Sequence, residues 1–133
     1  SESGNDWWQP HDYRGAEQWV VSYPWGCKPE HMTRHPRLAY LTAIPLYPTP
    51  LECVGRATLL DGWSDHGDGI AACQWALAQG IQMLEVHLCL PGRSREKSWD
   101  KTPEQIRQLR DFADAVSTIR TGVSQTFRER WSA

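Results

Sequence analysis

Residues 70–90 of the chain, IAACQWALAQGIQMLEVHLCL, decide the fold. Apolar side chains at positions 70, 73 and 77 have the spacing of a short helix, which Asp68 can cap at its start and Gly80 can end. Ile81–Leu90 follows at once and is apolar with alternation, which predicts a strand. A helix that leads directly into an apolar strand is typical of a parallel sheet with crossover helices, so we expect an α/β fold.

Two apolar runs before this stretch extend the pattern. Gln18–Tyr23 is rich in β-branched and aromatic residues and predicts a strand that Pro24 stops. Leu38–Leu46 is the second run, and its strand should end near Ile44 because Pro45 cannot donate a hydrogen bond to a neighbouring strand. A further strand end is expected at His66, just before the helix, so we expect about four parallel strands.

A helix is predicted near the end of the chain. Thr102-Pro103-Glu104-Gln105 is a capping box with proline at the first helical position. Helical spacing of apolar residues continues through Val116, and Gly122 can terminate the helix. The expected organisation is an N-terminal arm over 1–17, an α/β domain over 18–122 and a C-terminal tail over 123–133.

The composition excludes several classes of protein. The 133 residues are enough for one domain, and the 14 Lys and Arg against 16 Asp and Glu argue against a general nucleic-acid binder. No apolar run is long enough to cross a membrane. The four cysteines form no CxxC pair, which argues against a zinc ribbon or thioredoxin motif. Three of them lie in apolar surroundings as small hydrophobic residues, and we expect a cytoplasmic protein. The eight tryptophans point to core packing first, and to sugar stacking or an oligomer interface second.

The predicted strand 81–90 also carries the candidate chemistry. Side chains alternate along a strand, so Glu85 and His87 share one face near the carboxyl end, where parallel α/β folds bind their ligands. His66 lies 21 residues before His87, about the length of one strand–helix unit. Two histidines at successive strand ends could share a divalent metal. In an antiparallel edge strand the same face would be solvent-exposed and without function.

Three segments resemble successive motifs of the N-acetylneuraminate (sialic acid) synthase family. They are Tyr47-Pro48-Thr49-Pro50, Gly62-Trp63-Ser64-Asp65-His66 and Glu85-Val86-His87, in that order. Residues 101–109 resemble the next helix of that family, and the whole resemblance covers Trp19 to Ala115. The motifs are specific together, although none is specific alone.

The resemblance implies a (β/α)8 barrel that condenses phosphoenolpyruvate with an N-acetylated amino sugar. It implies a divalent metal, Mn above all with Zn or Co as alternatives, held by His66 and His87, with Glu85 as the acid or base. Further positions are implied near the substrates: Ser64 beside phosphoenolpyruvate, Tyr47 beside the amino sugar, and Glu96 or Asp100 as the acidic residue before the last helix.

The chain also departs from the family pattern. The resemblance covers only the second half of such a barrel, and Lys28, Lys97 and Lys101 do not match the phosphate-binding lysines of the first half. Pro45 replaces an expected asparagine. The segment between Pro50 and Ser64 is so short that its crossover helix should be short or missing.

These observations predict half of a (β/α)8 barrel. Because a four-stranded half barrel leaves two open edges, we expect a homodimer to complete it. The first hypothesis is a metal-dependent enzyme that forms or cleaves a carbon–carbon bond in a small carbonyl or sugar/phosphoenolpyruvate-type ligand. The second is a non-catalytic self-association or partner-binding module with relic motifs. The third is a carbohydrate-binding domain that stacks sugars on Trp7, Trp8, Trp25 and Trp63.

Overall fold

The structure is a computed structural model that describes residues 18–25, 35–93 and 97–131. Its strands form one sheet in the order β1-β2-β3-β4, and every neighbouring pair is parallel. This confirms the predicted α/β class and the four parallel strands. The bounds are β1 (Trp19–Pro24), β2 (Leu38–Ala43), β3 (Gly62–Asp65) and β4 (Met83–Val86).

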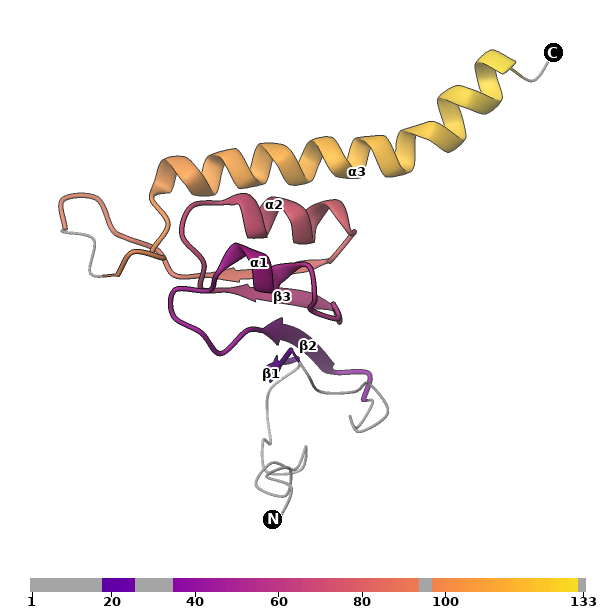
Figure 1. Cartoon of the computed structure of the whole chain (residues 1–133). Coiled ribbons are helices and arrows are strands. Elements are labelled where there is room, and N and C mark those ends of the chain that lie inside the picture. The colour runs from indigo at the N-terminus through magenta and orange to yellow at the C-terminus, as the bar shows by residue number, and fades with distance from the viewer. Residues whose placement is uncertain (1–17, 26–34, 94–96, 132–133) are drawn as a thin grey trace.

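Three helices connect or follow the strands, and Figure 1 shows all of them on the same side of the sheet. They are α1 (Leu51–Val54), α2 (Ala71–Ala78) and α3 (Pro103–Trp131). Helix α1 is only one turn long, as the short segment after Pro50 predicts. Helix α2 packs between β3 and α3. One face of the sheet is therefore covered by helices, as in one half of a barrel wall.

The register of the strands assigns residues to the two faces. Tyr23, Thr42, Trp63 and Leu84 lie in line across the sheet, and the fully buried Trp63 anchors the core beneath the helices. Ile44, Val54, Ala72 and Ala76 complete the buried part of this core. The alternate residues, which include Leu41, Ser64 and Glu85, belong to the opposite face.

Several local predictions agree with the structure. Strand β2 ends at Ala43, just before Pro45. The main-chain N–H of Gln105 donates to the Thr102 hydroxyl at 3.2 Å, and the Thr102 N–H donates to the Gln105 side chain at 3.0 Å. These two bonds are the reciprocal capping box. Gly80 follows α2 with φ of 89°, a conformation that glycine adopts without strain.

Other local predictions are wrong. Asp68 does not cap α2, because Gly69 turns the chain with φ of 67° and Ile70 becomes the N-cap without a side-chain bond. Strand β4 covers only Met83–Val86, not the whole of 81–90. Helix α3 does not end at Gly122 but continues to Trp131. Gly122 keeps an ordinary negative φ, so it lacks the left-handed turn with which glycine ends a helix.

Candidate functional site

The carboxyl ends of β2, β3 and β4 bring five of the seven predicted site residues together. Tyr47 follows β2, Ser64 and His66 lie in and after β3, and Glu85 and His87 lie in and after β4. Because β2, β3 and β4 are neighbours and parallel, their carboxyl ends meet at one edge of the sheet. The sixth residue, Asp100, precedes α3, and Glu96 lies outside the described residues.

The two histidines are direct neighbours. Their ring centroids lie 5.2 Å apart, with the planes tilted by 58°. The His66 side chain is almost fully buried, whereas His87 is exposed. Nδ1 of His66 is buried and has no hydrogen-bond partner. A buried nitrogen in this state is costly, so it marks a place where a partner is missing.

Burial lowers the pKa of His66 from the usual 6.5, and the neighbouring His87 imidazole lowers it further. The carboxylates of Asp65 and Glu85 oppose this shift, and the Lys101 ammonium adds to it. His66 is therefore kept neutral near pH 7. A neutral imidazole can bind a metal or accept a proton.

Glu85 is oriented by the strand beside it. Ser64 and Glu85 are register partners on β3 and β4, and the Ser64 hydroxyl donates to Glu85 Oε1 at 2.6 Å. Glu85 is exposed while Ser64 is buried. The bond fixes one carboxylate oxygen and leaves the other available to a ligand.

The Tyr47 ring packs against one of the two histidines, His66. Its ring centroid is 4.4 Å from that of His66 and 5.7 Å from that of Trp99. The main-chain N–H of Thr49 donates to the His66 carbonyl at 2.8 Å, which ties the loop after β2 to the end of β3. The aromatic contacts and this bond together place the exposed Tyr47 ring at the rim of the site.

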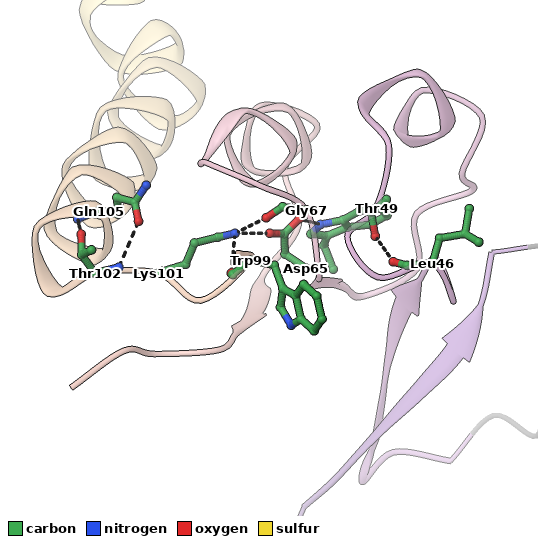
Figure 2. A network of polar contacts seen from close by, with 9 residues as sticks. Leu46, Thr49, Asp65, Gly67, Trp99, Lys101, Thr102 and Gln105 are labelled. Atoms are coloured by element: carbon green, nitrogen blue, oxygen red, sulfur yellow. Dashed lines mark hydrogen bonds and ion pairs between the residues drawn. The ribbon is translucent and has the colours of Figure 1, made fainter. Parts of the chain in front are cut away.

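Lys101 is a residue of the site that the sequence analysis missed. Its side chain is fully buried, and its ammonium forms an ion pair with Asp65 Oδ2 at 2.7 Å. Figure 2 shows Lys101 reaching from the segment before α3 toward the end of β3. The sequence contains no local signal for this contact, because a lysine before a capping box is normally solvated.

A pocket of about 210 Å³ opens beside His87. Among the described residues, its charged side chains are Arg93, Lys97 and Asp100, and the rest of the lining is His87, Leu88, Cys89 and Leu90. Asp100 is buried and its Oδ2 accepts the main-chain N–H of Lys97 at 3.1 Å. Asp100 thus holds its own loop, while the two cations carry the charge of the pocket.

The donor set suits a metal only in part. Among the described residues, no group of three or more His, Cys, Asp and Glu is arranged to hold an ion. His66 and His87 would be the two protein ligands, and the unpartnered Nδ1 of His66 fits this role. The remaining coordination positions would then be open to water and substrate.

Burial also decides what Trp63 and Cys73 can do, because both are fully buried. Trp63 is fully buried in the core, so it cannot stack on a sugar, and Trp25 packs against the same core. Trp7 and Trp8 lie outside the described residues. Burial raises the pKa of the Cys73 thiol, with a further contribution from the Asp65 charge, so this cysteine is no nucleophile.

No helix in the described segments has both the length and the apolar character needed to cross a membrane.

The fold of the chain is similar to that of a solved structure, whereas its sequence matches no known family. No family model matches the sequence, and no curated protein matches it. The structure is similar to the crystal structure of N-acetylneuraminic acid (sialic acid) synthetase from Leptospira borgpetersenii serovar Hardjo-bovis in complex with citrate, with a TM-score of 0.52 and 14% sequence identity. The match covers 72% of this chain and 41% of the synthetase chain. At this identity the similarity supports the fold, and this chain has the architecture of part of that larger protein.

Proposed function

We propose that the chain is a metal-binding half barrel whose histidine pair, His66 and His87, holds a divalent cation. The observation that carries the proposal is the pair itself. Two imidazoles lie 5.2 Å apart at the carboxyl ends of adjacent parallel strands, and one has a buried nitrogen without a partner. Mn is the first candidate, with Zn and Co as alternatives.

The same geometry supports a reaction on a small carbonyl compound. The bound metal would act as a Lewis acid toward the carbonyl oxygen. Glu85, with one oxygen held by Ser64, would take up or deliver a proton, and Tyr47 would cover the rim. Such an enzyme would form or cleave a carbon–carbon bond, as the resemblance to sialic acid synthases implies.

The pocket beside His87 favours an acidic ligand. Arg93 and Lys97 bring two positive charges to a space of about 210 Å³, and the only acidic side chain among its described lining residues, Asp100, already accepts a main-chain N–H. A carboxylate or phosphate group would be attracted by this charge. A sugar/phosphoenolpyruvate-type ligand carries such a group, which supports this substrate class.

Titration calorimetry with Mn, Co and Zn tests the metal proposal. We expect one cation to bind per His66–His87 pair, and we expect His66→Ala and His87→Ala each to abolish the heat of binding. His35→Ala is the matched control, because His35 precedes β2 and lies at the opposite end of the sheet. No heat from any of the three metals, or equal heats in all variants, would contradict the proposal.

A second copy of the chain is the partner that best completes the barrel. The outer edges of β1 and β4 have no strand beside them in the described structure, and eight strands make a barrel that side chains can fill. A twofold axis along the barrel would pair β1 of each copy with β4 of the other, in parallel. The exposed Val20, Leu88 and Leu90 side chains lie on or next to these edge strands.

The second candidate function is a non-catalytic self-association module. It is favoured by the lack of a third protein ligand around His66 and His87 in the described residues. Dimerisation without metal binding would support this candidate over the enzyme. Metal binding together with dimerisation would support the enzyme.

A further inference from the structure

A single buried residue, Lys101, ties together the parts of the chain that carry the two histidines. The Lys101 ammonium lies 2.7 Å from Asp65 Oδ2, and it donates to the main-chain carbonyls of Gly67 at 2.6 Å and Trp99 at 3.1 Å. Figure 2 shows the three contacts converging on the nitrogen. Two of these contacts are hydrogen bonds and the third is an ion pair.

Two of these three contacts flank His66. Asp65 and Gly67 are the residues immediately before and after it, so the ammonium holds the side chain on one side of this histidine and the main-chain carbonyl on the other. Asp65 is held in turn by Trp63, whose indole N–H donates to Oδ1 at 3.0 Å. The end of β3 is therefore held by buried contacts of Asp65 with Trp63 and Lys101.

The backbone of Lys101 holds the other histidine. Its N–H donates to the His87 carbonyl at 2.7 Å, and its carbonyl accepts the N–H of Cys89 at 2.8 Å. Lys101 and Leu88 accordingly form a parallel bridge beyond the end of β4. Lys101 is thus bonded to the flanks of His66 through its side chain and to His87 and Cys89 through its backbone.

We propose that Lys101 is a positioning residue that sets the separation of the His66 and His87 imidazoles. Its hydrogen bonds go to neither ring, and it acts through the two strand ends. Removing the ammonium would release the end of β3 while the backbone bonds still held the end of β4. The proposal concerns the pair in the metal-free protein, so it stands or falls separately from metal binding.

A charge-balanced double variant gives the sharpest test. Lys101→Met alone would leave the Asp65 carboxylate buried without its counter-charge, which would destabilise the protein for a general reason. Lys101→Met combined with Asp65→Asn removes both charges and keeps the acceptor that Trp63 uses. We expect this variant to be folded, as cooperative unfolding would show. In its folded state, the end of β3 should no longer be connected to the end of β4 through residue 101.

The readout is proton NMR of the metal-free protein. We expect nuclear Overhauser effects between the His66 and His87 rings in the unmodified chain, and their loss or clear weakening in the double variant. Lys97→Met controls for the loss of a lysine from the same loop, and Val54→Ala controls for a general loss of core stability. Both controls should retain the ring-to-ring signals.

Two results would overturn the proposal. One is a folded double variant with ring-to-ring signals at their original intensity. The other applies if the double variant does not fold, in which case Lys101→Arg is tested instead. This substitution replaces the compact ammonium by a planar guanidinium of different reach. Unchanged ring-to-ring signals in Lys101→Arg would then exclude a positioning role. Where a cation binds the unmodified chain, we expect the double variant to bind it about 10- to 100-fold more weakly, the usual effect of losing a residue that orients a ligand.

Discussion

The lowered pKa of His66 connects this residue to the pH dependence of folding. Its pKa is depressed by burial and by His87, so the unfolded chain binds a proton on this residue more readily than the folded chain. The contribution of neutral His66 to stability is therefore complete above the usual pKa of 6.5 and is lost as the pH falls below it toward the folded-state pKa.

We expect the free energy of unfolding to decrease between pH 7.5 and pH 5.5, and the decrease to be smaller in His66→Gln. Urea denaturation at a series of pH values measures this difference. His35→Gln is the control because it should leave the slope unchanged. A His66→Gln variant with the pH dependence of the unmodified chain would contradict the assignment.

At the level of elements, the capping box of α3 is a local interaction between residues three positions apart. Thr102→Ala removes the acceptor for the N–H of Gln105 and should lower the free energy of unfolding by about 1 kcal/mol. Thr118→Ala is the control, because Thr118 is exposed within α3 and its hydroxyl bonds only the Asp114 carbonyl one turn earlier. Equal losses in the two variants, measured by urea denaturation, would argue against the cap.

Gly62 occupies a position on β3 where a side chain has no room. A Cβ at this position would collide with the main-chain carbonyl of Met83 and with the Leu41 side chain, and the carbonyl belongs to the paired strand β4 and cannot move away cheaply. We expect Gly62→Ala to destabilise the protein by about 1–3 kcal/mol in thermal or urea unfolding. Gly55→Ala, where a Cβ meets open space, should change stability little.

Features that depend on residues close together in the sequence could be predicted, whereas features that depend on packing between distant residues could not. The capping box and the end of β2 depend on residues within a few positions of one another, and both agree with the structure. The shorter β4 and the helix that passes Gly122 depend on what packs beside them, which periodicity does not contain. That His66 and His87 lie close together could be predicted, because each was expected at the end of one of two successive strands.

Lys101 illustrates what the sequence could not provide. Its bond to the Gly67 carbonyl spans 34 positions, and no pattern around either residue indicates the partner. The family resemblance predicts phosphate-binding lysines on strands, whereas Lys101 reaches the site from the segment before α3. Buried ion pairs of this kind become visible only once the three-dimensional arrangement is known.

At the scale of the whole molecule, the open sheet predicts self-association. We expect light scattering coupled to size exclusion to give twice the chain mass of 15.2 kDa. Val20 is 49% exposed on β1 and points to the face without helices, so Val20→Glu should shift the mass toward one chain without loss of helix or strand signal. A single-chain mass for the unmodified protein would contradict the homodimer.

Ile119 provides the control for that experiment. It is 66% exposed on α3, which lies on the helix-covered side of the sheet. Ile119→Glu introduces the same charge at another exposed apolar position and should leave the mass unchanged. Monomers in both variants would mean that any added negative charge, rather than the edge strand, controls association.

The buried contact between Lys101 and Asp65 also has a kinetic consequence. Neither charge can leave water favourably before the other arrives, so the end of β3 and the segment before α3 must dehydrate in the same event. Opening is subject to the same constraint: a fluctuation that lifts the start of α3 lets water reach both groups and frees the two strand ends together. Amide hydrogen exchange at Gly67 and Lys101 should then occur at matching rates, since one breathing motion would expose both.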